Sequence, residues 1–161
     1  DSGVLRGGQT GAAHITVWDI KGKKVLETRT AMRKLAFPYI PGLLSFREIP
    51  AILAAMAEGT SEFTGVRRAR FKESNRISAV RQGLERAGIH VEEEEDRLVI
   101  TGGKLRNAVI DSHNDHRIAM AFSMMGAAAG GVRIENAECV SKTYPAYWDA
   151  LRKLGVMIDE R

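Results

Sequence analysis

Residues 112–130 read SHNDHRIAMAFSMMGAAAG, and the second half of this stretch has the spacing of a helix. Its apolar residues recur at steps of four, three and four: Ile118, Phe122, Met125 and Ala129. Asn114 or Asp115 precedes this run as a candidate N-cap. Arg117 then falls in the first turn, where its charge opposes the positive end of the helix dipole. A bound anion would offset that opposition, because the free N–H groups at a helix N-terminus already attract anions.

The composition is that of a folded domain with a modest excess of positive charge. The chain has 161 residues, of which 44% are hydrophobic and 27% charged, enough for a core and unlike a disordered chain. It begins at Asp1 rather than Met, and we expect one domain or a fragment of a larger protein. A net charge of +4 suits an anionic partner, such as a phosphorylated metabolite, a nucleic acid or a membrane surface.

The single cysteine and the hydropathy pattern bear on location. Cys139 has no second cysteine with which to form an internal disulfide, which is typical of a reducing compartment. No apolar run has the length of a membrane span. We therefore expect a cytoplasmic protein with no membrane partner.

The chain has a repeated order of helices and strands. Residues 1–12 hold four glycines and no periodicity, and we expect a flexible lead-in before a domain over 13–161. The order helix, glycine, strand, basic connection, capped helix, glycine, strand occurs twice, in units expected at about 47–101 and 107–159. Two such units predict an internally repeated α/β or α+β fold with a mixed sheet.

Apolar spacing and capping residues place the other helices. One helix is predicted from about Arg47 to Ala57. Ser74 is predicted to cap the next helix and Thr143 the last, and residues 156–159 are predicted as a final strand. The residues expected to face inward are Ile49, Ile52, Leu53 and Met56 in the first, Ile77, Val80, Leu84 and Ala87 in the second, and Tyr144, Tyr147, Leu151 and Leu154 in the last.

Basic residues stand at three of the predicted helix entrances. Lys72 and Arg76 flank the start of the second helix, Arg117 lies in the first turn of the third, and Lys142 immediately precedes the last. If the repeats place these ends side by side, four cations converge on one small anionic substrate. Arginine would bind its carboxylate or phosphate as a two-pronged fork and lysine as a point charge.

Other interpretations of these cations stay open. They could form a solvated surface, or they could contact nucleic acid. Arg67, Arg68 and Arg70 form a basic strip, but Phe71 is the one aromatic residue beside it that could stack on a base. We therefore expect a solvated connection there and no nucleic-acid partner.

The candidate proton-transfer groups are Glu73, which lies between two of the cations, and Asp115 with His116. His113 and His116 lack a third ligand at a suitable spacing, so we expect capping or hydrogen-bonding roles and no metal. Cys139 is expected to be a buried small hydrophobe, because no partner base is identifiable.

Three motifs closely resemble the C-terminal motifs of one enzyme family. They read KESNR at 72–76, NDHRIAMAF at 114–122 and SKTYP at 141–145. The family is 5-enolpyruvylshikimate-3-phosphate synthase, also called 3-phosphoshikimate 1-carboxyvinyltransferase. The resemblance is strongest over residues 47–159 and weaker over 13–46.

The resemblance implies a fold and a reaction. The family fold has two domains built from βαβαββ units, and this chain would hold about two of the three units of one domain, without the N-terminal region of the enzyme. The family moves the enolpyruvyl group of phosphoenolpyruvate to the 5-hydroxyl of shikimate 3-phosphate, in the shikimate pathway of aromatic amino acid biosynthesis. It requires no metal or organic cofactor, and the herbicide glyphosate competes for the phosphoenolpyruvate site.

The resemblance also implies roles for individual residues. Arg76, Arg117 and Lys142 would bind phosphoenolpyruvate. Lys72 would bind shikimate 3-phosphate and act with Glu73 in catalysis, where Glu73 would transfer a proton.

Two positions depart from the family motifs. The family's Asp-Glu-Ile-Pro reads Arg-Glu-Ile-Pro here, with Arg47 at the Asp position, and an ungapped distance to Lys72 places Ser45 there instead. Neither is a carboxylate, although Glu48 is adjacent, and Asn75 stands where the family has a second Asp. We therefore expect an incomplete chain with little activity alone, or a non-catalytic anion-binding or assembly domain of the same fold.

Overall fold

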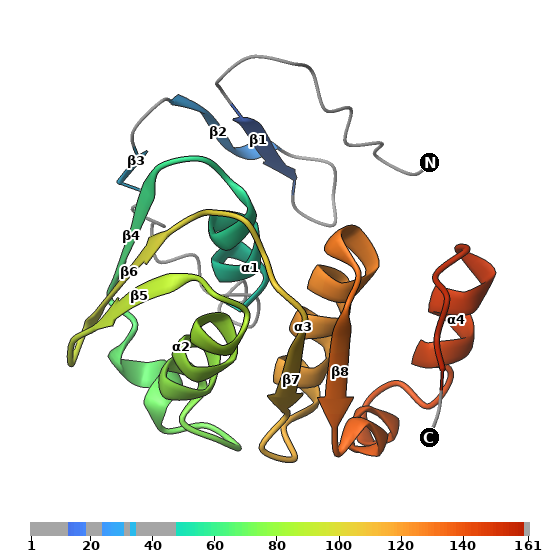
Figure 1. The fold of residues 1–161 in the computed structure, drawn as a ribbon. Coiled ribbons are helices and arrows are strands. Elements are labelled where there is room, and N and C mark those ends of the chain that lie inside the picture. Colours follow the sequence, from blue (N-terminus) through green and yellow to red (C-terminus); the bar gives the residue numbers. More distant parts are fainter. Residues whose placement is uncertain (1–12, 19–23, 31–32, 35–47, 160–161) are drawn as a thin grey trace.

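The computed structural model describes residues 13–18, 24–30, 33–34 and 48–159, in which helices alternate with short strands (Figure 1). In chain order the elements are β1 (Ala13–Trp18), β2 (Lys24–Thr30), β3 (Arg33–Lys34), α1 (Glu48–Met56), β4 (Thr60–Thr64), the 3-10 helix η1 (Arg67–Arg70), α2 (Arg76–Arg86), β5 (His90–Glu93), β6 (Arg97–Thr101), β7 (Ala108–Asp111), α3 (His116–Ala129), β8 (Val132–Glu135), the 3-10 helix η2 (Ala137–Lys142) and α4 (Tyr147–Lys153). The expected lead-in at 1–12 and the positions of Ser45 and Arg47 lie outside the described residues.

The strands form three sheets of mixed direction. The largest has the order β3-β4-β6-β5, in which β3 runs parallel to β4 while the other neighbours are antiparallel. β7 pairs with β8 in parallel, and β1 pairs with β2 as an antiparallel hairpin. This mixture confirms the predicted α+β class with a mixed sheet.

The order of elements repeats along the chain. From β3 to β6 it is strand, helix, strand, helix, strand, strand, and from β7 to α4 the first four members of that order recur. The predicted strand at 156–159 is wrong, since those residues pair with no strand among those described. The Val156 amide instead donates to the Leu151 carbonyl at 3.1 Å, closing the end of α4.

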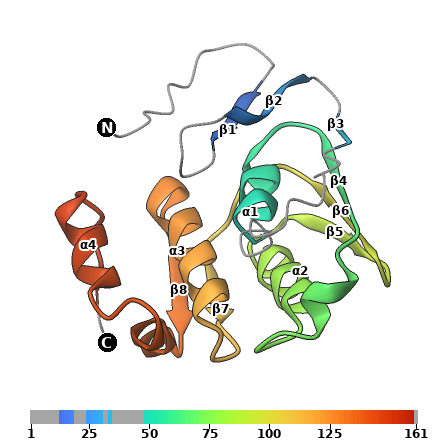
Figure 2. The ribbon, with the colours of Figure 1, turned by 180° about the vertical axis from the view of Figure 1, so that it is seen from behind.

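One hydrophobic core joins the elements from α1 to β6 with β7 and α3. It contains residues of α1, α2 and α3 together with the strands beside them, and its fully buried members include Leu84, Ile100, Ile110 and Phe122. A second cluster holds α4 against α3 and η2 through Ala119, Cys139, Val140, Tyr147 and Leu151. Both views place α4 at the opposite end of the molecule from the four-stranded sheet, with α3 between them (Figure 1 and Figure 2).

The predicted helix faces are partly correct. In α1 Ile52 is buried, but Leu53 and Met56, which were predicted to face inward, are 36% and 40% exposed. All four inward residues predicted for the second helix are buried. In the last helix Tyr147 and Leu151 are buried, while Tyr144 (44% exposed) and Leu154 (80% exposed) flank α4 and were wrongly predicted.

Two predicted caps differ from the structure. Asn75, not Ser74, caps α2 by accepting a hydrogen bond from the Ser78 amide. Thr143 does not cap the last helix: it is the C-cap of η2, and α4 begins only at Tyr147 after Ala146. The first error is a shift of one residue, and the second arises because the 3-10 helix η2 was not predicted.

The basic strip at 67–70 forms η1 against the hairpin of β5 and β6. Arg67 and Arg68 are exposed, as expected of a solvated connection. Arg70 is not: its side chain is 15% exposed and pairs with Glu93. Among the described residues, no helix is both long enough and apolar enough to cross a membrane.

Candidate functional site

The turn before α3 is shaped by its polar residues. His113 and Asn114 adopt positive φ angles of 52° and 56°, so the backbone reverses sharply between β7 and α3. The Asn114 amide donates to Ser112 Oγ at 3.1 Å, and Ser112 is fully buried. Asp115 then caps α3 by accepting a hydrogen bond from the Arg117 amide at 3.0 Å, which confirms it as one of the two predicted caps.

The start of α2 is joined directly to the start of α3. Because Asn75 caps α2, the Ser74 hydroxyl is left to donate to Asp115 Oδ2 at 2.9 Å. Arg76 Nε donates to the same oxygen at 2.7 Å, and Arg76 Nη2 donates to Asp115 Oδ1 at 3.1 Å. This two-pronged pair is buried, with Arg76 4% exposed and Asp115 fully enclosed.

Two further carboxylates surround Arg76. Its Nη2 pairs with Glu73 three residues earlier, and its Nε lies 3.5 Å from Glu48 Oε1 at the start of α1. One guanidinium therefore links the N-terminal ends of α1, α2 and α3. Arg76, a predicted substrate-binding residue, is therefore enclosed by three carboxylates.

The pKa values of the buried acids diverge. Burial alone would raise the pKa of Asp115, but hydrogen bonds from Arg76, the Arg117 amide and Ser74 hold it below its ordinary value. Burial raises the pKa of Glu48 above its ordinary value, despite a backbone hydrogen bond and the charges of Arg76 and Arg117. Asp115 is therefore the carboxylate that the hydrogen bonds around Arg76 keep ionised.

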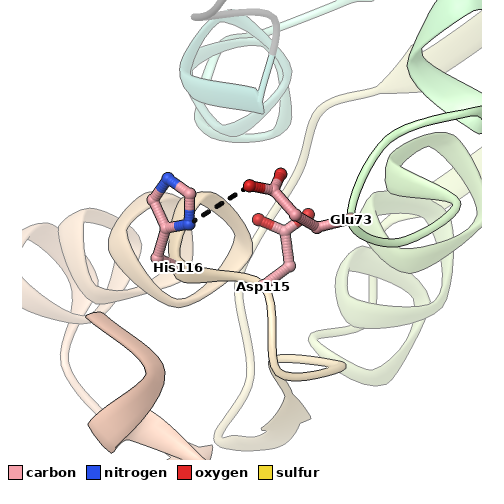
Figure 3. Close-up of side chains that lie close together, drawn as sticks. All are labelled: Glu73, Asp115 and His116. Atoms are coloured by element: carbon pink, nitrogen blue, oxygen red, sulfur yellow. Dashed lines mark ion pairs between the residues drawn. The ribbon is translucent and has the colours of Figure 1, made fainter. Parts of the chain in front are cut away.

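Glu73 and His116 face each other across the two helix entrances (Figure 3). Glu73 Oε1 lies 3.8 Å from His116 Nδ1, and the side chains are 56% and 11% exposed. Glu73 is therefore open to solvent while it touches a mostly buried imidazole. A group so placed could exchange a proton with a bound substrate.

Glu73, Asp115 and His116 each offer a ligand atom, and these atoms lie within 4.8 Å of one another. The donor chemistry does not favour a metal ion. Both Asp115 oxygens accept hydrogen bonds, and the Arg76 guanidinium already lies between Asp115 and Glu73. A cation would have to displace that positive charge.

The remaining predicted cations lie at or beside the same helix ends. Lys142 Nζ donates to Asn114 Oδ1 at 3.2 Å, which joins the end of η2 to the turn before α3. Arg117 is half-buried, and its charge partly opposes the rise that burial causes in the pKa of Glu48. Lys72 is exposed and precedes Glu73 in the chain. The starts of α2 and α3 and the end of η2 therefore lie together, but Lys142 does not stand at the entrance of the last helix as predicted, because α4 begins only at Tyr147. Arg76 is enclosed by acids, and Lys72 lies at the solvent.

Sequence reasoning missed three contributors to this arrangement. Glu48 carried no signal beyond its place in the Arg-Glu-Ile-Pro motif, next to Arg47, and Ser74 was predicted to be a cap. Asn114 was considered only as a cap, although an Asn before a helix can also bind a neighbouring cation. Their partners come from distant segments, between 28 and 41 positions away in the sequence.

Comparison with known proteins identifies the family of this chain. The family model for EPSP synthase (3-phosphoshikimate 1-carboxyvinyltransferase) matches residues 24–151. A 3-phosphoshikimate 1-carboxyvinyltransferase from Dehalococcoides mccartyi (strain ATCC BAA-2266) is 61% identical over 105 residues, which are 65% of this chain and 25% of that protein. One from Pseudomonas savastanoi pv. phaseolicola is 42% identical over 135 residues, which are 76% of this chain and 32% of that protein.

The fold gives the same result. An EPSP synthase structure from Acinetobacter baumannii superposes with a TM-score of 0.69 at 28% identity, over 92% of this chain and 37% of that one. The chain spans about a quarter to a third of the length of the curated relatives that it matches. The predicted enolpyruvyl transferase-like fold, present in part, is confirmed. With the family model covering residues 24–151, the chain belongs to the EPSP synthase family.

Proposed function

We propose that this chain supplies the phosphoenolpyruvate-binding side of an enzyme that makes 5-enolpyruvylshikimate 3-phosphate. The enzyme would move the enolpyruvyl group of phosphoenolpyruvate to the 5-hydroxyl of shikimate 3-phosphate and release phosphate. The observation that carries the proposal is the Arg76–Asp115 pair, which holds the cation-bearing ends of α2 and α3 together. Family membership supports the same conclusion.

Phosphoenolpyruvate carries a carboxylate and a phosphate, so its site needs cations and N–H donors. Arg117 lies in the first turn of α3, where the helix dipole adds to its charge, and Lys142 sits beside Asn114 at the same end. Arg76 adds its charge at the start of α2, where its Nε and Nη2 bind acids. Arg117 and Lys142 are the groups proposed to bind phosphoenolpyruvate directly.

Lys72 and Glu73 are proposed to serve the second substrate and the proton transfer. Lys72 is exposed on the segment before α2 and would bind shikimate 3-phosphate as a point charge. When a hydroxyl adds to the enol carbon, the neighbouring carbon must take up a proton and lose it again as phosphate leaves. Glu73, exposed and 3.8 Å from His116, is the proposed carrier of that proton.

The curated relatives are three to four times as long as the part of them that this chain matches, which bears on the activity expected of the chain alone. We propose that it holds about two of the three βαβαββ units of one domain, which the element order from β3 to α4 supports. The rest of the enzyme would close the pocket from the other side, and orienting two substrates supplies much of the rate in such reactions. The isolated chain should therefore bind phosphoenolpyruvate but not turn it over.

A chimera tests this function. The 105 matched residues of the Dehalococcoides relative are replaced by those of this chain, and phosphate release from phosphoenolpyruvate plus shikimate 3-phosphate is measured. We expect turnover by the chimera and none by the isolated chain. Robust turnover by the isolated chain would refute the half-site view.

A second candidate function is a non-catalytic anion-binding or assembly domain of the same fold. One observation favours it: Glu48, the carboxylate next to the altered motif, has a side chain only 6% exposed and faces Arg76 rather than solvent. In that case the chimera would bind phosphoenolpyruvate without turnover when it carries Arg47, and Arg47→Asp would restore phosphate release. Turnover without that change would exclude this candidate.

We also propose a cytoplasmic location, which a buried and unpaired Cys139 supports.

A further inference from the structure

Glu93, at the end of β5, binds groups on both sides of the segment that carries Lys72 and Glu73. We propose that Glu93 is a positioning residue for this segment, residues 71–75, because it fixes η1 and α2 relative to each other. That this segment matters for substrate binding rests on the proposed function. That Glu93 positions it rests on the contacts of Glu93 with Arg70, Ser78 and Arg81, which lie outside the site.

On the η1 side, Arg70 directs its guanidinium to the hairpin tip between β5 and β6. Nη1 binds Glu93, Nε donates to the Glu95 carbonyl at 2.9 Å, and Nη2 donates to the Glu94 carbonyl. The Arg67 amide donates to Asp96 Oδ1 at 2.7 Å. Both ends of η1 are therefore attached to the tip.

On the α2 side, the same carboxylate accepts two more hydrogen bonds. Ser78 Oγ donates to Glu93 Oε1 at 2.8 Å, and Arg81 Nε donates to Glu93 Oε2 at 2.7 Å. Burial would raise the pKa of Glu93, but the bonds from Arg70, Ser78 and Arg81 lower it below its ordinary value. The carboxylate is thus an anion that joins the element before the segment to the element after it.

The segment itself is anchored unevenly. Residues 71–75 form no helix or strand, and both Phe71 and Lys72 are exposed. Ser74 binds Asp115 and Glu73 binds Arg76, so the second half is held by the helix ends. The first half, with Lys72, continues directly from η1, whose Arg70 is bound by Glu93.

An exposed ion pair would have little effect, since such pairs contribute about 0–1 kcal/mol. Glu93 differs because its side chain is 14% exposed and Arg70 is 15% exposed. Its three side-chain donors are two guanidinium groups and a hydroxyl, and charge-assisted bonds of this kind are the strong ones. Loss of the charge should therefore release η1 from α2 without opening the core.

Backbone relaxation of the 161-residue chain tests the proposal. 15N order parameters are measured for the wild type, for Glu93→Gln and for the control Glu92→Gln, an exposed neighbour that pairs only weakly with His90 at 3.4 Å. In Glu93→Gln the order parameters of the Phe71 and Lys72 amides should fall from the rigid range near 0.85 to below about 0.6, and those of residues 73–75, which the helix ends hold, should change less. In Glu92→Gln they should stay as in the wild type.

Titrations with shikimate 3-phosphate and with phosphoenolpyruvate, followed by the amide shifts of α2 and α3, form the second arm. Glu93→Gln should weaken the binding of shikimate 3-phosphate about fivefold, because Lys72 is no longer preorganised, while the affinity for phosphoenolpyruvate, assigned to Arg117 and Lys142, stays as in the wild type. If the wild type itself does not bind phosphoenolpyruvate, the proposed function fails, and the relaxation data still decide the positioning role.

If Glu93→Gln does not fold, the smaller change Ser78→Ala still tests the proposal. Ser78→Ala removes one hydroxyl donor and leaves the charge pairs in place, so it should lower the same order parameters by a smaller amount. Wild-type order at Lys72 in a folded Glu93→Gln, or in Ser78→Ala where only that variant folds, would overturn the proposal.

Discussion

Arg76 and Asp115, 39 positions apart in the sequence, form a buried two-point ion pair with N–O distances of 2.7 and 3.1 Å. The pair fastens the first residue of α2 to the cap of α3. It therefore fixes the separation between the two segments that carry the proposed substrate-binding groups. Arg76 therefore stabilises the fold in addition to any role in binding a ligand.

Asp115→Asn should destabilise the chain by about 3 kcal/mol, because it leaves the buried Arg76 with one fewer compensating charge. Asn can still cap α3, so the loss reports the ion pair rather than the cap. Urea unfolding at pH 7 measures the difference. Asp149→Asn is the matched control, since Asp149 is 69% exposed and pairs with Arg152 on the surface of α4, where a loss of about 0–1 kcal/mol is expected.

The same pair has a defined pH dependence. The pKa of Asp115 is lowered in the folded state, so its stabilisation is complete above the ordinary value of 3.8 and is lost as the pH falls through the folded value. The gap between wild type and Asp115→Asn should shrink as the pH is lowered below about 4. A gap that stayed constant in acid would contradict the ion-pair explanation.

Glu48→Gln should show the opposite pH dependence. Burial raises the pKa of Glu48 in the folded state, so folding favours its protonated form. Its stabilisation is full below the ordinary value of 4.5 and is lost as the pH rises through the folded value. The variant should therefore gain stability relative to the wild type as the pH is raised from 4.5 to 8.

Urea midpoints at several pH values measure this gain. Glu58→Gln, an exposed change after the end of α1, is the control and should follow the wild type throughout. If Glu48→Gln instead lost stability relative to wild type with rising pH, the Glu48 carboxylate would be a net stabilising partner of Arg76.

Lys142→Met should weaken phosphoenolpyruvate binding by about tenfold or more, since a hydrogen bond to a charged group contributes about 1.5–3 kcal/mol. Lys142 is held beside Asn114 at the start of α3, so its charge lies at the proposed site. Calorimetric or NMR titration at fixed salt measures the affinity. Lys153→Met, an exposed lysine at the end of α4, should leave the affinity unchanged. Equal weakening by both variants would indicate general charge attraction rather than a site.

The elements set by local signals could be predicted from the sequence. The spacing around Phe122 and the cap at Asp115 each depend on neighbours within one or two helical turns, and each is found in the structure. The inner face of the second helix, from Ile77 to Ala87, follows from helical spacing in the same way and is buried. Such signals need no knowledge of what packs against them.

The features set by distant partners could not be predicted. Ser74 and Asn75 are both good caps, and the choice between them is linked to Asp115, 41 positions from Ser74, which binds its hydroxyl. Arg76 carries the same sequence signal as Arg117, but the buried acids around it come from other helices. Helical spacing likewise identifies the inner face of α1 without showing that Leu53 lies at its margin.

α2 contacts α3 closely at a glycine. A Cβ added to Gly83 would lie less than 3.0 Å from three ring atoms of Phe122, which is fully buried. Ala in place of Gly within a helix gains about 1 kcal/mol, whereas overpacking a core costs about 1–3 kcal/mol. Because several ring atoms are too close at once, overpacking should dominate.

Gly83→Ala should therefore lower the free energy of unfolding by about 1–2 kcal/mol. Combining it with Phe122→Leu should cost less than the sum of the two single changes, because the shorter side chain makes space for the new methyl group. Gly103→Ala is the control: its added Cβ would meet only Ile89 at 3.9 Å, and a change within about 0.5 kcal/mol is expected. Urea unfolding of the four variants gives the coupling energy. Strict additivity would show that α2 and α3 shift apart to admit the methyl group, and that the spacing held by Arg76 and Asp115 is softer than their burial indicates.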